Sequence, residues 1–137
     1  MDLRKLIFWY KVLVMQLTYK QYRWYYGYYC ELLLQTYNTL KELNVSNNNI
    51  TDVQSIGEAL KTNNTLKTLY LSRNNITDDS GIQSIIDVLK TNNTLRWLYL
   101  GNNQLSCNMR SQLDDIQEYK RDGSNGYQQV EGMIIVT

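Results

Sequence analysis

The sequence predicts an α/β repeat fold, in which short strands form a curved parallel sheet on the inside and helices cover the outside. Three copies of one segment dominate the middle of the 137-residue chain. They are LKELNVSNNNIT from Leu40, LKTLYLSRNNIT from Leu66 and LRWLYLGNNQLS from Leu95. The stretches between them carry apolar residues at helical spacing. Units that alternate one strand with one helix stack side by side and share a continuous core.

Each copy fits the pattern L-x-x-L-x-L-x-x-N-x-L, and consecutive copies start 26 and 29 residues apart. The alternating apolar residues predict a short strand that points every second side chain inward. The shared asparagine follows the strand, where its amide can bind backbone groups that a turn leaves without partners. We therefore expect a structural role for Asn48, Asn74 and Asn103.

The linking stretches predict helices on the outside of the stack. Apolar residues recur there at the three- and four-residue spacing of a helix face. A last helix is expected after the third copy. The residues with this spacing are Ile56, Ala59 and Leu60, then Ile82, Ile85, Ile86 and Leu89, and finally Met109, Leu113 and Ile116.

Both flanks match the repeat weakly, and three bare units would expose their core. We expect residues 1–39 to form an N-terminal cap and a degenerate first repeat, with residues 40–122 as the three clear repeats. Residues 123–137 are expected to form a loop and a terminal strand in which Val130, Met133 and Ile135 continue the rhythm. All of these belong to one predicted solenoid domain of about four repeats plus the terminal strand. Strands are expected near Met15, Leu43, Leu69, Leu98 and Met133.

The three copies resemble the leucine-rich repeat family. Their length resembles its ribonuclease-inhibitor-like class, which also occurs in the repeat domains of NOD-like receptors. The resemblance implies a leucine-rich repeat solenoid that binds another protein, without catalytic activity and without a cofactor.

Composition removes several classes of function. The chain contains no histidine, which excludes histidine metal sites, histidine general bases and triads that need histidine. A net charge of +1 gives no global argument for binding nucleic acid or an anionic membrane. Neither a phosphate-binding loop nor a dinucleotide fingerprint is present. We therefore expect no enzyme, no bound metal and no nucleic-acid partner.

Residues between the inward leucines are expected to point to the concave face and to form columns across neighbouring repeats. The first column holds Val14, Glu42, Thr68 and Trp97, and the second holds Gln16, Asn44, Tyr70 and Tyr99. Basic residues flank the columns, at Lys41, Lys67 and Arg96 before the strands and at Arg73 after one of them.

Tryptophan, tyrosine and arginine are enriched in binding hot spots, so the columns predict a surface that contacts another protein. The alternative is that the aromatic pairs only stabilise the sheet. The candidate binding residues are Glu42, Asn44, Thr68, Tyr70, Arg73, Trp97 and Tyr99.

The N-terminal segment is rich in tyrosine, with eight of the 12 tyrosines in the first 37 residues. Its cluster YRWYYGYY is expected to cap the open end of the stack. An aromatic contact surface and a decayed repeat are the alternatives.

We expect an intracellular, cytoplasmic protein. The apolar run from Leu6 to Leu17 is too short to span a membrane and lacks a cleavage pattern. The two cysteines, Cys30 and Cys107, fit neither a disulfide framework nor a zinc site and are expected to be buried. The alternative is a secreted or surface glycoprotein, since N-x-S/T sequons occur at Asn44, Asn49, Asn63, Asn75 and Asn92.

Overall fold

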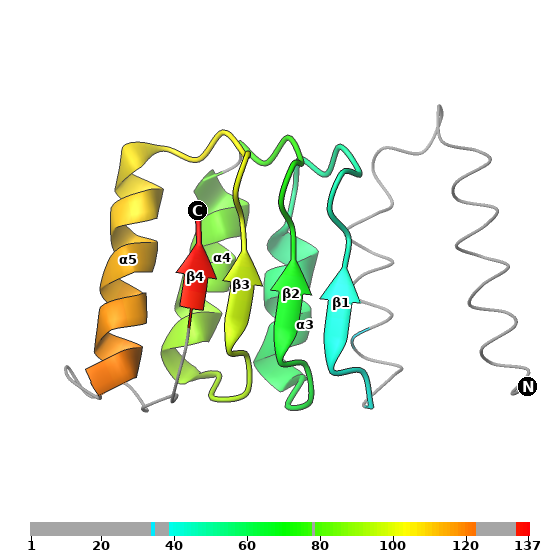
Figure 1. Cartoon of the computed structure of the whole chain (residues 1–137), viewed down its shortest axis with the longest axis vertical. Helices are drawn as coiled ribbons and strands as arrows, with labels where there is room; N and C mark the ends of the chain where they lie inside the picture. Colours follow the sequence, from blue (N-terminus) through cyan, green and yellow to red (C-terminus); the bar gives the residue numbers. More distant parts are fainter. Residues whose placement is uncertain (1–33, 35–38, 78, 123–133) are drawn as a thin grey trace, which may run out of the picture.

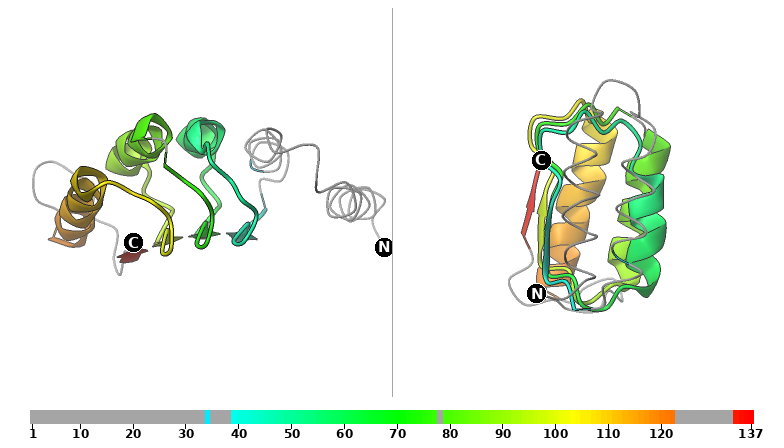
Figure 2. Two further views of the ribbon diagram at one scale, coloured as in Figure 1. Left: turned by 90° about the horizontal axis from the view of Figure 1, so that it is seen from above. Right: turned by 90° about the vertical axis from the view of Figure 1, so that its right-hand side faces the viewer.

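The computed structural model describes residues 34, 39–77, 79–122 and 134–137. Within these ranges four parallel strands form one sheet in the order β1-β2-β3-β4. One helix lies between each pair of consecutive strands, and all three helices lie on the same side of the sheet (Figures 1 and 2). The elements are β1 (Glu42–Asn44), α3 (Gln54–Thr62), β2 (Thr68–Tyr70), α4 (Asp79–Thr91), β3 (Trp97–Tyr99), α5 (Cys107–Asp122) and β4 (Ile134–Val136). The predicted α/β repeat fold is confirmed.

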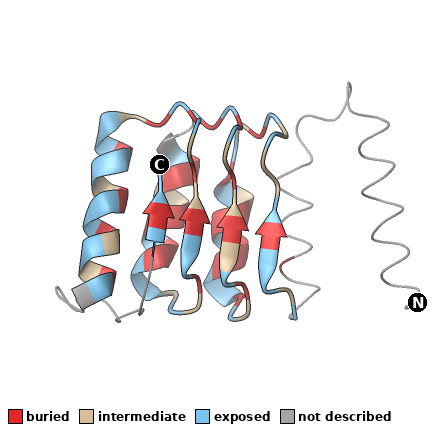
Figure 3. Ribbon diagram, viewed as in Figure 1, coloured by how far each residue is buried: buried red, intermediate tan, exposed pale blue. Residues whose placement is uncertain are grey.

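Equivalent leucines of successive repeats lie next to each other in the sheet. Leu43 pairs with Leu69, and Leu69 pairs with Leu98, so the strands differ by one whole repeat and by no further shift. These central residues form a buried line across the sheet, with more exposed residues before and after them (Figure 3). The three repeat strands begin at the residue before each predicted leucine.

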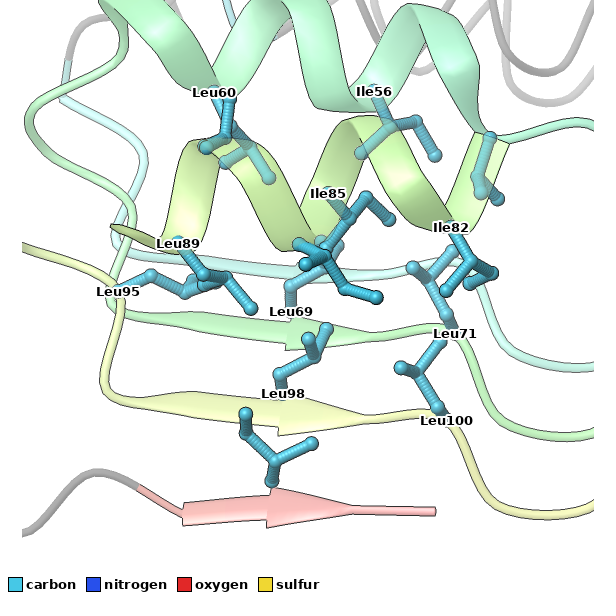
Figure 4. Close-up of a cluster of buried hydrophobic side chains, with 14 of the residues drawn as sticks. Ile56, Leu60, Leu69, Leu71, Ile82, Ile85, Leu89, Leu95, Leu98 and Leu100 are labelled. Carbon is cyan, nitrogen blue, oxygen red and sulfur yellow. The ribbon is translucent and has the colours of Figure 1, made fainter. Parts of the chain in front are cut away.

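The core lies between the sheet and the helices. Leucines of β2, β3 and the residues just after them point toward the apolar faces of α3 and α4 (Figure 4). Leu69, Leu71 and Leu98 are completely buried. All of the apolar helix residues identified from their spacing are also buried, which confirms the helices and the faces that they bury.

Asn74 connects two successive turns of the chain. Its Oδ1 atom accepts hydrogen bonds from the N–H groups of Asn48, at 2.8 Å, and Ile50, at 3.1 Å. Its Nδ2 atom donates to the carbonyls of Val45, at 3.1 Å, and Leu71, at 2.8 Å. The amide thus binds backbone groups of its own repeat and of the preceding one. Because it satisfies polar groups that the turns would otherwise bury unpaired, its predicted structural role is confirmed.

Asn103 repeats this arrangement one unit later. It accepts a hydrogen bond from the N–H of Ile76, at 3.2 Å, and donates to the carbonyls of Leu71, at 3.0 Å, and Leu100, at 2.8 Å. Asn48 is half-buried and donates to the Ser46 carbonyl, at 3.0 Å. The asparagines therefore form a ladder at the end of the strands.

A second asparagine ladder lies at the other end of the repeats, where the recurring sequence TNNT follows a helix. Asn92 accepts hydrogen bonds from the N–H groups of Thr94, at 3.0 Å, and Leu95, at 2.9 Å. It donates to the carbonyls of Leu60, at 3.0 Å, and Asn63, at 3.2 Å. Asn63 holds the N–H groups of Thr65 and Leu66 in the same way. These hydrogen bonds explain why the sequence TNNT recurs.

Lys120 extends the second ladder from α5. Its side chain is completely buried, and its Nζ atom donates to the Asn92 carbonyl at 2.8 Å. Burial lowers the pKa of Lys120, because desolvation disfavours the charged ammonium group. A lysine therefore binds the backbone at the end of the third repeat, where an asparagine does so in the two repeats before it.

Two expectations need correction. The repeat pattern predicts that Met133 pairs with Leu98. In the structure Ile135 pairs with Leu98, so the terminal strand is shifted by two residues. A shift of two keeps every side chain on its expected face, and Ile135 is buried. Cys107 is exposed at the start of α5, because the inward face of that helix begins at Met109.

Several expectations lie outside the described residues. They concern the degenerate first repeat with Met15, the tyrosine-rich cluster, Cys30, and both Val130 and Met133 of the terminal segment. In the part of the chain that the structure describes, no helix has the length and apolar character needed to cross a membrane.

The turns after β1, β2 and β3 share one position in the left-handed backbone region, and the turn after β1 contains a second such residue, Asn49, with a φ angle of 53°. Asn47, Arg73 and Asn102 occupy equivalent positions, with φ angles of 61°, 55° and 57°. This conformation directs the N–H of Arg73 to the Gly101 carbonyl, at 2.8 Å, so it is needed for the link to the next repeat. Asparagine tolerates the left-handed region better than arginine does, and Arg73 therefore holds a strained backbone.

We expect Asn74→Ala to lower the free energy of unfolding by about 3 kcal/mol, because it leaves buried backbone groups of two repeats without partners. Urea denaturation measures the change. The matched control is Asn75→Ala, which alters the exposed neighbouring side chain and should change stability by less than about 0.5 kcal/mol. Similar losses in the two variants would contradict the role assigned to the ladder.

We expect Arg73→Asn to raise the free energy of unfolding by about 0.5 to 1 kcal/mol, because asparagine adopts the left-handed conformation at lower cost. The converse variant, Asn47→Arg, should lower it by a similar amount at the equivalent position. Both changes are read from denaturation midpoints at constant m-value. A less stable Arg73→Asn variant would show that the arginine side chain stabilises the turn by more than its backbone strain costs.

Candidate functional site

The side of the sheet away from the helices carries the predicted columns, and we call it the open sheet face. Strand pairing places Glu42, Thr68 and Trp97 next to one another in the first column. The second column aligns Asn44 with Tyr70 and Tyr99. These side chains alternate with the buried leucines and therefore point away from the core. The helices cover the opposite face of the sheet and leave this one uncovered. The helices and the sheet thus form two layers (Figure 2).

Three aromatic rings of β2 and β3 form a stacked row on the open sheet face. The rings of Tyr70 and Tyr99 are 4.6 Å apart between centroids and inclined by 10°. The rings of Trp97 and Tyr99 are 6.4 Å apart and inclined by 6°. Neighbouring repeats place Tyr70 and Tyr99 in register, and Trp97 lies two residues before Tyr99 on the same strand, so each ring packs against the next. We refer to the three residues as the aromatic row.

The terminal strand enlarges this apolar surface. Ile134 pairs with Trp97 and Val136 pairs with Tyr99, so β4 adds one residue to each column. The exposed fractions are 38% for Trp97, 36% for Ile134 and 41% for Val136, which makes them the exposed large apolar residues of the described chain. Ile134 and Val136 were not among the predicted site residues, although their alternation with Ile135 carries the signal.

Glu42 borders the aromatic row on β1. Its carboxylate accepts a hydrogen bond from the Tyr70 hydroxyl. Partial burial, followed by this hydrogen bond and the negative charge of Glu42, raises the pKa of Tyr70 above its usual value.

Basic residues precede three of the strands, which start at the lower edge of the sheet in Figure 1. Lys41, Lys67 and Arg96 each immediately precede a strand, and all three are exposed. Their backbones continue the sheet pairing, since the Lys41 carbonyl accepts the Lys67 N–H at 2.8 Å and the Lys67 carbonyl accepts the Arg96 N–H at 2.9 Å. We call these three residues the basic column.

The structure brings together six of the seven predicted site residues on the open sheet face. Glu42, Asn44 and Trp97 are exposed there, and Thr68, Tyr70 and Tyr99 are half-buried. Arg73 is exposed in the turn that follows β2, beyond the strand itself. The remaining members of the two columns, Val14 and Gln16, lie outside the described residues.

The neighbouring carboxylates of the last helix lie away from the open sheet face. Asp114 and Asp115 are exposed on α5, in the other layer. Among the residues that the structure describes, no group of three or more Cys, Asp or Glu side chains could hold a metal ion. What the face offers chemically is an apolar, aromatic area bordered by positive charge.

Comparison with known proteins identifies the repeats. Residues 38–90 match the family described as Leucine Rich repeats (2 copies). No curated protein sequence matches the chain. One similar solved structure is "Leiomodin-1 Actin-Binding Site 2 (ABS2)", with a TM-score of 0.55 and 27% identity over 70% of this chain. The match spans 57% of the length of that structure. The chain therefore carries leucine-rich repeats and adopts the leucine-rich repeat fold.

Proposed function

We propose that the chain is a non-catalytic module that binds another protein through the open sheet face, the concave face of the predicted solenoid. One observation carries the proposal: the most exposed large apolar residues of the described chain border or belong to the aromatic row. Exposed apolar surface of this kind commonly marks a contact site. The centre of the proposed site is Trp97, with Tyr70 and Tyr99 beside it.

The arrangement of the rings supports contact over a purely structural role. Stacking two aromatic residues across strands stabilises a sheet by about 0.2 to 1 kcal/mol. That stabilisation does not require the rings to expose a large part of their surface. Trp97 nevertheless exposes 38% of its surface, although it stacks on Tyr99 and pairs with Ile134. Rings held rigidly lose little conformational entropy on binding, which is the property of a good anchor.

The similar solved structure is an actin-binding site of leiomodin-1, which makes actin the first defined partner to test. The match covers 57% of that structure. We also propose the ribonuclease-inhibitor-like class, from the 26- and 29-residue repeats, and a single solenoid that includes residues 1–39 and 123–137.

We further propose an intracellular location over the secreted, glycosylated alternative. Asn63 and Asn92 use their side-chain amides to donate to the carbonyls of Leu34, at 2.9 Å, and Leu60, at 3.0 Å. A glycan on either amide nitrogen would disrupt these contacts. Two of the five sequons are therefore unsuitable acceptors in the folded chain, and glycan occupancy at the exposed Asn49 or Asn75 would favour the alternative.

We expect Trp97→Ala to weaken partner binding by about 2 kcal/mol or more, close to a thirtyfold rise in Kd, because the central ring of the contact is lost. The free energy of unfolding should fall by no more than about 1 kcal/mol, the value of a cross-strand pair. Titration of labelled monomeric actin is the first measurement. Affinity capture from the native source, with wild type and variant side by side, extends it to other partners.

The aromatic control is Tyr119→Ala, which removes a ring from α5 in the helix layer and should leave binding unchanged. Unaltered binding by Trp97→Ala, combined with a large loss of stability, would show that the ring belongs to the sheet and that the proposed site is wrong.

A further inference from the structure

The two layers of the molecule differ in charge. The strands, the residues directly before them and the turn after β2 contain four basic residues, Lys41, Lys67, Arg96 and Arg73, and one acidic residue, Glu42. On the helix side, acidic residues outnumber basic ones among the described side chains. The acidic residues there are Asp52, Glu58, Asp87, Asp114, Asp115 and Glu118, and the basic ones are Lys61, Lys90, Arg110, Lys120 and Arg121. A net charge of +1 therefore conceals a positive sheet side.

The basic column places like charges one residue before each of three adjacent strands. Strands lie about 4.8 Å apart, and like charges directly opposite each other on a sheet are destabilising. On the helices, by contrast, the described ion pairs join Lys61 to Glu58, at 2.6 Å, and Lys90 to Asp87, at 2.8 Å. Within the same described residues, no ion pair involves the basic column. An anionic group outside this part of the chain would offset the repulsion.

We propose that the open sheet face binds an extended acidic segment of a protein partner, one that inserts an apolar side chain against the aromatic row. This inference rests on the proposed function and adds the chemistry of the partner. Carboxylates of the segment would pair with Lys41, Lys67 and Arg96, while an apolar residue contacts Trp97. The three cations span about 10 Å at strand spacing, and an extended chain covers that distance in about three residues.

The stacked rings favour a peptide over a single-stranded nucleic acid. Nucleic-acid platforms offer a free aromatic face to each base. Here Tyr70 and Tyr99 turn their faces to each other, at a centroid distance of 4.6 Å, and Trp97 lies parallel to Tyr99. Aliphatic and aromatic side chains can contact the exposed parts of this row without unstacking it.

The test uses a fluorescein-labelled ten-residue peptide in which Asp alternates with Leu, and a second peptide with Asn in place of every Asp. Fluorescence anisotropy measures both affinities at low and high salt. We expect the acidic peptide to bind more tightly, and added salt to weaken that binding alone.

The decisive variant is Lys67→Gln with Arg96→Gln, which should weaken binding of the acidic peptide about tenfold, as two charge contacts are lost. The matched control, Lys61→Gln with Lys90→Gln, removes the same charge from the helix side and should bind like the wild type. Equal loss in both double variants, equal affinity for the two peptides, or no binding of either peptide would overturn the proposal.

Two further probes separate the other classes of anionic partner. The probes are a thymidine oligonucleotide and phosphatidylserine vesicles. If either binds more tightly than the acidic peptide, and the Lys67→Gln, Arg96→Gln variant loses that binding, the acidic-segment proposal is also overturned. A partner that Trp97→Ala loses and the charge variant retains would leave the proposed function standing and contradict only the acidic segment. A partner that both variants retain would contradict the two proposals together.

Discussion

The side-chain amide of Asn74 is the constraint on which the rest of the structure depends. A chain that leaves a strand, turns and enters a helix exposes N–H and carbonyl groups inside the molecule, where water cannot reach them. Asn74 binds two N–H groups and two carbonyls across successive repeats. It thereby holds the turns at a constant offset. The strands consequently pair without shift, and each column of outward side chains is continuous from β1 to β3.

That constant register is also what creates the candidate site. An aromatic ring on a single strand would be an isolated exposed apolar residue, which does not indicate a contact site. Because Tyr70 and Tyr99 occupy the same position of adjacent repeats, their rings meet at 4.6 Å and form one surface. The same regularity aligns the charges of Lys41, Lys67 and Arg96 along the neighbouring edge. Repetition thus aligns residues that differ from one unit to the next into a continuous surface.

Much of the fold was predictable because its signals are local. Leu43, Leu69 and Leu98 each lie within a pattern of alternating apolar residues, and that pattern determines the buried face of a strand wherever the strand pairs. The two columns of the open sheet face follow from the same alternation. Other features depend on groups distant in the sequence. The shift of Ile135 to pair with Leu98, and the contact of Lys120 with Asn92, both join segments that no short pattern relates.

By itself the sequence determined the repeat unit, the faces of its strands and helices, and the residue types available for contact. Tertiary structure alone decided which of those residues touch. It stacked the aromatic row, added Ile134 and Val136 beside it, exposed Cys107 and buried Lys120 in the second asparagine ladder. The physical reason is that sequence periodicity depends on residues close together in the chain and specifies only the direction in which each side chain points. Distance and burial arise only when whole repeats are packed against one another.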